Sequence, residues 1–396
     1  MSNPYREIIR KLDGLAKARF IETFGDIRVN SKSFPVISFG EYTNQMNIGP
    51  FGSDLKNDCF VPASEGYCMV YEQKHAIDKD FFSEKRYISK EKYDQLRRFD
   101  VGPGDILVSC RGTIGKCVLI PDGLEHGVIH PSLMMIKPKS DVNPRFLLLL
   151  LEKVLESQIE EGSGVKMAIK ASKLSKIQTI YPPKELQDKF VSFITLIDIA
   201  KSFALQAAEK YDLLVKSRFI EMFGTRETYS EKWEMKPFTS CCDVLYGFPF
   251  NSELFNENSE GMPLIRIRDI NTGFSNTYTT EKVDPIYEVH NGDILVGMDG
   301  DFCAKQWTSG TALLNQRTCK MKGIEGIVND QFMLHYLEPE LLQIHRNTAS
   351  TTVKHLSAKE INKMKMPLPP LDLQEEFSAF VEQVDKSKFV DSGGDE

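Results

Sequence analysis

Residues 11–25 of this chain read KLDGLAKARFIETFG, and residues 210–224 read KYDLLVKSRFIEMFG. Ten of the fifteen positions are identical, and the two copies lie 199 positions apart. A second pair, PPKELQDKF at residues 182–190 and PPLDLQEEF at residues 369–377, recurs at a spacing of 187. Self-similarity of this kind is the signature of a repeated architecture. The sequence therefore predicts one structural unit that is used twice.

The middle copy of the repeat carries apolar residues at the alternating four-and-three spacing of a coiled-coil helix. Its predicted seam consists of Leu186, Phe190, Phe193, Ile197, Ala200, Ala204, Ala207, Tyr211 and Leu214, followed by Arg218. Each chain end supplies half of another copy of this seam. The halves are Tyr5, Ile8, Leu12 and Leu15, followed by Arg19, near the N-terminus, and Leu373, Phe377, Phe380 and Val384 near the C-terminus. We expect the two ends to form a split helix that runs antiparallel to the central one.

The spacing of the repeats predicts an α+β protein with two globular mixed α/β domains. Long antiparallel coiled-coil helices join them in a circular layout with approximate two-fold symmetry. The expected segments are residues 1–25 (first half of the split helix), 26–183 (first domain), 184–224 (central helix), 225–370 (second domain) and 371–396 (second half of the split helix, fraying from Asp385). Each globular segment is long enough to bury a core of its own.

The composition is that of an ordinary soluble protein, with 41% hydrophobic and 27% charged residues. The longest apolar run, residues 146–151, is far shorter than the roughly 20 residues of a membrane span, and no secretory leader is recognisable. Eight cysteines without regular spacing predict neither a disulfide framework nor a zinc site, so we interpret them as small buried side chains of a reduced, cytoplasmic protein.

Within the globular segments, short β-branched and aromatic runs bounded by Gly, Pro, Asn and Asp indicate strands. The motif GDILV occurs at residues 104–108 and again at 292–296, and each copy predicts a turn followed by a buried strand and a hairpin. A turn at residues 49–54 matches another at 247–253. Residues 263–270 (PLIRIRDI) indicate one further strand, on which Arg266 and Arg268 would share a face.

The PP-x-x-x-Q starts at residues 182–187 and 369–374, the two GDILV turns and the PLIRIRDI segment together resemble the specificity subunit of type I restriction-modification enzymes. The resemblance covers essentially the whole chain. It implies that residues 26–183 and 225–370 are target recognition domains, each reading one half of a split DNA sequence, while the helices set the spacing.

The same resemblance implies the partners of the chain. Two modification subunits carrying S-adenosylmethionine would dock beside the domains, and restriction subunits with ATP and magnesium would join to cut double-stranded DNA. No cofactor or metal is expected on this chain itself. The net charge of −7 weighs against DNA binding by the whole surface, so local basic groups must carry the contacts.

Basic and amide side chains in the expected loops are the candidates for DNA contact, because Arg and Lys bind phosphate or guanine and Gln pairs with adenine. The DNA-binding candidates are Lys74, Arg86, Arg97, Arg98, Arg111, Lys116, Arg266, Arg268, Lys305, Gln316 and Arg317. Gln73 and Asn315 are further candidates for base contacts. For each of these side chains taken singly, a solvated surface position explains its occurrence about as well.

Catalytic signatures are weak in this sequence. The segment at residues 112–116 resembles a phosphate loop but lacks its first glycine and its Ser or Thr. The Asp-Gly-Asp at residues 299–301 fits a polar turn better than a nuclease site. We therefore expect a non-catalytic subunit. The alternative function is a protein-binding scaffold on the same two-domain helical frame, in which DNA has no part.

Overall fold

The computed structural model describes residues 4–160, 170–348 and 354–390 of the chain. The chain divides into two compact units. The first unit comprises residues 12–200, and the second contains the segment before residue 12 together with the chain from residue 201 onward.

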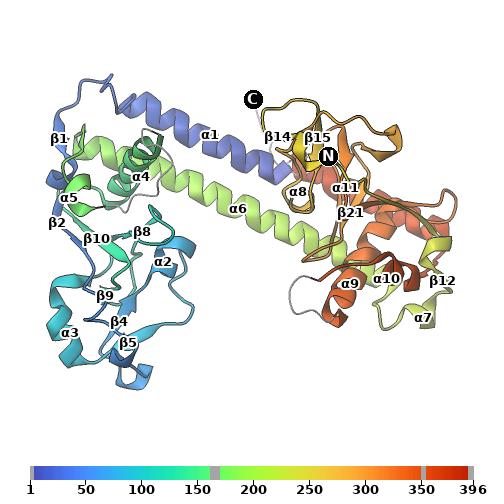
Figure 1. Ribbon diagram of the computed structural model, residues 1–396, viewed down its shortest axis with the longest axis horizontal. Helices are drawn as coiled ribbons and strands as arrows, with labels where there is room; N and C mark the ends of the chain where they lie inside the picture. The colour runs from blue at the N-terminus through green and yellow to red at the C-terminus, as the bar shows by residue number, and fades with distance from the viewer. Residues whose placement is uncertain (1–3, 161–169, 349–353, 391–396) are drawn as a thin grey trace. The chain divides into compact units, whose positions relative to one another are not determined.

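Three helices carry the repeat found in the sequence, and they are α1 (Pro4–Phe24), α6 (Lys184–Phe223) and α11 (Leu371–Val390). The central helix α6 runs without interruption for 40 residues (Figure 1), which confirms the predicted continuous helix. It contains neither proline nor glycine, and it starts directly after a proline pair. It ends at Phe223, and the φ of +95° at the following Gly224 is typical of the residue after a helix C-terminus, as is the φ of +72° at Gly25 after α1.

Helix α11 continues through Val390, so the first part of the segment expected to fray has helical backbone. Residues 391–396 lie outside the described part of the chain. Although the sequence has no long uninterrupted apolar run, helix α6 is long and apolar enough to pass as a membrane span by length and composition alone. This is weak evidence, because core helices of soluble proteins pass the same test.

The described residues of the first unit form three sheets, of two, four and five strands. The two-stranded sheet pairs β1 (Val36–Ser38) with β11 (Gln178–Ile180). The four-stranded sheet has the order β2 (Thr43–Ile48), β10 (Leu133–Pro138), β7 (Ile106–Ser109) and β8 (Cys117–Leu119). The five-stranded sheet has the order β3 (Phe60–Val61), β5 (Arg86–Ile88), β4 (Cys68–Tyr71), β9 (Gly127–Ile129) and β6 (Asp100–Val101).

The remaining helices of the first unit are short except for α4. They are α2 (Gln73–Asp78), α3 (Lys90–Leu96), α4 (Pro144–Glu160) and α5 (Ala171–Leu174). In the described part of the unit, 3₁₀ turns also lie at Phe39–Tyr42, Asn57–Cys59, Ala63–Glu65 and Arg97–Phe99.

The second unit repeats the same three sheets in the same order. Its two-stranded sheet pairs β12 (Met235–Pro237) with β22 (Lys365–Pro367). Its four-stranded sheet has the order β13 (Cys242–Tyr246), β21 (Thr318–Gly323), β18 (Ile294–Gly297) and β19 (Cys303–Gln306). Its five-stranded sheet has the order β14 (Phe255–Asn256), β16 (Tyr278–Thr279), β15 (Met262–Ile265), β20 (Ala312–Leu314) and β17 (Glu288–Val289).

Three helices of the second unit match helices of the first, namely α8 (Ile267–Thr272) with α2, α9 (Asp330–Asn347) with α4 and α10 (Ala358–Lys363) with α5. Helix α7 (Tyr229–Lys232) lies where the first unit has a turn, and the segment equivalent to α3 is not helical. Its 3₁₀ turns lie at Phe238–Ser240, Ser252–Leu254 and Pro285–Tyr287. The repeat therefore extends through the globular parts, where sequence identity had shown only the GDILV motif and the short turn before it.

The two GDILV motifs form the predicted buried strands. Strands β7 and β18 are fully buried and pair with β8 and β19 as antiparallel hairpins. Gly104 and Gly292 precede them with φ values of +89° and +101°, a conformation that favours glycine. The matching turns at residues 49–54 and 247–253 likewise depend on glycine, because a Cβ on Gly49 would lie 2.3 Å from a backbone oxygen and one on Gly247 only 2.0 Å.

The prediction of a strand over residues 263–270 was wrong beyond Ile265. Strand β15 ends there and helix α8 begins at Ile267, because the Asp269 carboxylate accepts the backbone N–H of Arg266 at 2.9 Å and starts the helix. Arg266 and Arg268 therefore do not share a strand face. The apolar spacing of this segment fits a strand and a helical turn equally well.

Aromatic clusters join the helices to each domain core. In the first unit, Phe20 and Phe24 of α1 contact Phe190 of α6 with ring centroids 5.6 and 5.0 Å apart. In the second unit, Phe219 and Phe223 of α6 pack on Phe377 of α11 at 5.3 and 5.6 Å. In both places the C-terminal part of one helix meets the N-terminal part of the other, so the paired helices are antiparallel.

The ends of the chain meet α6 within the second unit. Tyr5 of α1 lies 6.2 Å from Tyr211 of α6, measured between ring centroids. Tyr211 in turn packs against the hydrophobic core that contains Val384 of α11. Both chain ends therefore approach the same stretch of α6, as the split-helix prediction requires.

Most predicted seam residues are buried or partly buried in their own unit. Buried are Tyr5, Phe190, Ile197, Ala204, Phe377 and Val384, and partly buried are Leu186, Phe193, Ala200, Ala207, Tyr211, Ile8, Leu12, Leu373 and Phe380. Leu15 and Leu214 are 49% and 48% exposed and do not belong to the seam, whereas Ile194 and Val215 are buried instead. A straight helix drifts by about 20° per heptad from a strict seven-residue repeat, which shifts the buried stripe by one position.

The cysteines are free, and six of the eight are buried. Cys241 and Cys242 lie in the core of the second unit, which confirms their interpretation as small hydrophobic side chains. Burial raises the pKa of the Cys319 thiol to about 12.

Candidate nucleic-acid interface

In each unit, a short helix begins directly after a strand of the five-stranded sheet and brings polar side chains to the end of that strand. In the first unit α2 follows β4, and the backbone N–H of Glu72 donates to Nδ1 of the buried His75 at 2.7 Å. In the second unit α8 follows β15, and the Asp269 carboxylate accepts the backbone N–H of Arg266 as Nδ1 of His75 accepts that of Glu72. The local geometry is the same, although the residues differ.

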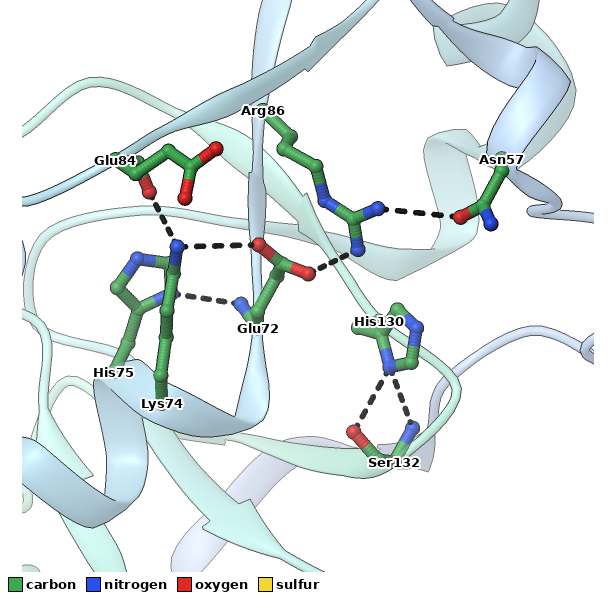
Figure 2. A network of polar contacts seen from close by, with 8 residues as sticks. All are labelled: Asn57, Glu72, Lys74, His75, Glu84, Arg86, His130 and Ser132. Carbon is green, nitrogen blue, oxygen red and sulfur yellow. Dashed lines mark hydrogen bonds and ion pairs between the residues drawn. The ribbon is translucent and has the colours of Figure 1, made fainter. Parts of the chain in front are cut away.

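Glu72 is the centre of a charged network at the start of α2. Figure 2 shows its carboxylate between Arg86 of β5, which it binds through Oε1, and Lys74, whose Nζ lies 3.6 Å from Oε2. Burial would raise the pKa of the Glu72 carboxyl, but the hydrogen bond and charge of Arg86 and the charge of Lys74 hold it below the ordinary value. Glu72 is therefore ionised at neutral pH.

Arg86 is held on three sides. Its Nη2 binds Glu72, its Nη1 lies 3.4 Å from Oδ1 of Asn57, and its guanidinium carbon lies 3.8 Å from the centre of the Phe60 ring. Lys74 donates in addition to the backbone carbonyl of Glu84. These two DNA-binding candidates thus lie together, and each already makes polar contacts within the domain.

The loop between β7 and β8 is tied to α2. Nε2 of Gln73 donates to the carbonyl of Arg111 and to that of Thr113, the latter at 3.3 Å. Gln73 therefore fixes this loop in the structure, and the adenine contact that the sequence suggested stays a prediction. The side chains of Arg111 and Lys116 on this loop are exposed.

Arg97 and Arg98 lie on the 3₁₀ turn after α3, and both are exposed. The guanidinium of Arg98 lies 4.5 Å from the centre of the Phe99 ring. Among the described residues no hydrogen bond or ion pair joins this pair to the Glu72 network. The structure therefore brings together only part of the basic set of the first unit.

In the second unit, Arg266 and Arg268 flank the first residue of α8, and both are exposed. Nε of Arg268 lies 3.7 Å from Oδ1 of Asp269. Lys305 is an exposed residue of β19, opposite Leu295 of β18.

Gln316 and Arg317 form the exposed tip of the connection between β20 and β21, whereas Asn315 before them is buried. Nη1 of Arg317 lies 3.5 Å from Asp299, on the loop after β18, and 3.4 Å from Nδ1 of His355. The Asp299 carboxylate also contacts Nδ1 of His355, at 2.5 Å.

Sequence reasoning missed the groups that organise these clusters, namely Glu72 and His130 in the first unit and Asp299 and His355 in the second. His130 lies beside the Glu72 network, with Nδ1 2.8 Å from the hydroxyl of Ser132, and burial lowers its pKa. The sequence signal that could have found the two carboxylates is their place after a buried strand: Glu72 directly follows β4, and Asp299 lies two residues after β18.

The fold defines a class of protein that carries two copies of one α+β domain on long helices. The family described as type I restriction modification DNA specificity domain matches residues 19–210 and 230–389. These spans cover most of the sequence, and the chain belongs to this family.

The chain is also similar to individual proteins. Over 162 residues the chain is 41% identical to the specificity subunit of the type I restriction enzyme EcoBI of Escherichia coli. This aligned segment covers 40% of the present chain and 34% of the EcoBI subunit. It is 22% identical over 354 residues to a protein of Methanocaldococcus jannaschii described as the type I restriction enzyme MjaX specificity subunit, spanning 81% and 80% of the two chains. A solved type I restriction-modification S subunit from M. genitalium is similar over 92% of this chain and 91% of its own, at 12% identity and a TM-score of 0.46.

Proposed function

We propose that this chain selects the DNA target of a type I restriction-modification complex and leaves the chemistry to partner subunits. Residues 26–183 and 225–370 act as two target recognition domains, each reading one half of a split sequence in double-stranded DNA. Residues 1–25, 184–224 and 371–396 form the helical frame. Two modification subunits bring S-adenosylmethionine, and restriction subunits bring ATP and magnesium, in the cytoplasm.

One observation carries this proposal: the two units share strand order and register but carry different side chains at equivalent positions. Strand β4 pairs with β9 through Tyr71 and Ile129, and β15 pairs with β20 through Ile265 and Leu314. The residues that follow these strands are therefore equivalent. By this register Glu72 corresponds to Arg266, His130 to Asn315 and Ser132 to Arg317.

A shared frame with exchanged polar groups is what recognition of two different half-sites requires. Positions that follow buried strands are fixed by the sheet, while their side chains are free to vary without loss of the core. Direct readout of bases depends on such fixed, interchangeable donors and acceptors. A protein-binding scaffold would not need two polar surfaces of equal geometry and different chemistry.

The central helix offers a surface for the modification subunits. Large apolar side chains of α6 lie in solvent, and Leu196 and Phe203 are each 66% exposed. Others on this helix are Ile199, Leu205, Leu213 and Ile220. Exposed apolar residues in such number are typical of protein interfaces. Phe219 and Phe223, by contrast, belong to the core of the second unit and are not available for docking.

The length of α6 supports its role as a spacer. At a rise of about 1.5 Å per residue, 40 residues extend for about 60 Å. A helix without proline or glycine holds this length more rigidly than a loop would.

A domain exchange tests the proposed function. Residues 225–370 are replaced by the corresponding segment of another family member, the chain is produced with its modification subunits, and methylated motifs are read by sequencing the genomic DNA. We expect a two-part motif in which one half changes and the other half and the gap persist. Tight partner binding with no methylated motif and no dependence on DNA would favour the scaffold instead.

A further inference from the structure

Arg317 has an unusual backbone. It is a non-glycine residue with a φ of +69°, in the left-handed region, which costs on the order of 1–3 kcal/mol. Hydrogen bonds on both sides impose this conformation: its carbonyl accepts the N–H of Met298 at 2.9 Å, and the N–H of the preceding Gln316 donates to the carbonyl of Phe248 at 2.8 Å. This conformation lowers the stability of the fold, and it sets the direction in which the Arg317 side chain leaves the backbone.

The guanidinium of Arg317 is anchored at one nitrogen only. Nη1 lies 3.5 Å from both carboxylate oxygens of Asp299. Within the described ranges, Nε and Nη2 form no hydrogen bond or ion pair, and the side chain is 55% exposed. One edge of the guanidinium thus faces the protein, and the other donors remain available.

Asp299 is itself fixed by a second segment of the chain. Residues 354–356 form a short bridge to the loop after β18, in which Gly300 N–H donates to the carbonyl of Lys354 at 3.0 Å and Leu356 N–H donates to that of Met298 at 2.6 Å. This bridge places His355 against Oδ1 of Asp299. The carboxylate is therefore held in place before any ligand arrives.

The equivalent corner of the first unit carries different residues at the positions of Arg317 and Asp299. Ser132 occupies the position of Arg317, and the loop after β7 closes on Gln73 instead of on a carboxylate. The contact between Arg317 and Asp299 is thus not repeated in the described part of the first unit, as we expect of a determinant of one half-site.

We propose that Arg317 is the residue of the second domain that recognises a guanine in its half-site, and that Asp299 and His355 are its positioning residues. This inference rests on the proposed function. An arginine reads guanine by donating two parallel hydrogen bonds to O6 and N7, which requires a fixed guanidinium plane with two donors available. A phosphate at the same place would meet the negative charge of Asp299, whereas the edge of a base pair carries no net charge.

The test uses the complete complex with its modification subunits and duplexes that carry the two-part motif found by methylation sequencing. The domain exchange identifies which half-site belongs to the second domain. Binding is measured by competition between the original duplex and duplexes in which each base pair of both half-sites is substituted in turn. The variants are Arg317→Lys and Asp299→Asn, with Arg346→Lys as the matched control on an exposed surface of α9.

We expect Arg317→Lys to reduce discrimination at a single G·C pair of the second half-site by roughly 5- to 150-fold. Asp299→Asn should weaken discrimination at that same pair to a smaller extent. The first half-site, the dependence of affinity on salt and the Arg346→Lys variant should all match the wild type. A role confined to folding would lower affinity for every duplex and would not select one base pair.

Three results would overturn the inference: equal losses at all positions, a second half-site without a G·C pair, or variants that discriminate like the control. A reduced dependence on salt with unchanged discrimination would make Arg317 a phosphate contact and would also overturn it. These results leave the proposed function intact. If the wild-type complex binds no sequence preferentially, the proposed function itself fails and the inference falls with it.

Discussion

Replacement of Gln187 by methionine should loosen the attachment of α6 to the first domain. Gln187 is fully buried, and its amide joins two segments: Oε1 accepts the N–H of Asn143 at 3.0 Å, and Nε2 donates to the carbonyl of Pro182 at 2.9 Å. Asn143 in turn accepts the N–H of Arg145 at the start of α4. The glutamine therefore links the first turns of α4 and α6.

The expected loss follows from these two bonds. Methionine preserves the approximate length and volume of the side chain, so no large cavity opens and the hydrogen bonds are the main change. A buried polar group left without a partner costs about 1–3 kcal/mol, and because Asn143 is only partly buried we expect about 2–4 kcal/mol in total. For a domain of this size, a loss of about 3 kcal/mol lowers the melting temperature by about 6–12 °C.

Two further variants show whether the loss belongs to the buried glutamine of one unit. Gln374 occupies the equivalent position in the second unit, where Oε1 accepts the N–H of Asn329 and Nε2 donates to the carbonyl of Pro369, both at 2.9 Å. Gln374→Met should therefore destabilise the second unit by a similar amount. Gln206→Met, on the exposed surface of α6, is the control and should change stability by less than about 0.5 kcal/mol.

Hydrogen exchange read by mass spectrometry assigns the loss to a unit, and urea unfolding gives its size. We expect Gln187→Met to accelerate exchange in α4 and Gln374→Met to accelerate exchange in α9. If Gln187→Met were as stable as the Gln206 control, or if both units loosened equally in each variant, the buried amide would not be the link described above.

Other parts of the structure give further predictions. Phe223→Ala should cost about 3–5 kcal/mol in urea unfolding of the second unit, because this fully buried ring packs on other aromatic rings; a loss under 1 kcal/mol would contradict its place in the core. Gly49→Ala should destabilise the first unit by about 1–3 kcal/mol, since the new Cβ would lie 2.3 Å from the carbonyl oxygen of His130, and equal thermal stability would refute this steric argument. Burial lowers the pKa of His75 below the ordinary value of about 6.5, so the unfolded chain binds the proton more tightly; stability should be complete above pH 6.5 and decline as the pH falls through the folded pKa. Urea midpoints between pH 7.5 and 5 should show this decline and a smaller one for His75→Asn, whose amide oxygen can still accept the N–H of Glu72; parallel profiles would exclude His75 as a cause.

The helical frame could be predicted from the sequence because its information is local and periodic. The repeat predicted that Arg19 and Arg218 occupy equivalent positions, and in the structure each lies over an aromatic ring of the neighbouring helix. The guanidinium carbon of Arg19 lies 5.5 Å from the centre of the Phe193 ring, and that of Arg218 lies 5.8 Å from the centre of the Phe380 ring. The PP-x-x-x-Q motif was visible as a pattern, but its reason was not. The partner of Gln187 lies 44 positions away, where no spacing rule can point to it.

The candidate site was less predictable because its contacts, like those of Gln187, join residues that are far apart in the sequence. Arg86 meets Glu72 across 14 positions, and Arg317 meets Asp299 across 18 and His355 across 38. Sheet register and loop closure create these pairs, and a single sequence records neither. Composition identified the basic side chains correctly as exposed in most cases, but it could not tell that both Nη atoms of Arg86 contact Glu72 and Asn57.

The central claim is that α6 sets the distance between two independent reading domains. Four residues of helix-forming sequence inserted after Ala204 add about 6 Å and close to one full turn, which corresponds to about two base pairs of DNA. Methylation sequencing of cells that produce this variant with its modification subunits should reveal both original half-sites separated by a longer gap. An unaltered gap, or a change in either half-site, would contradict the claim.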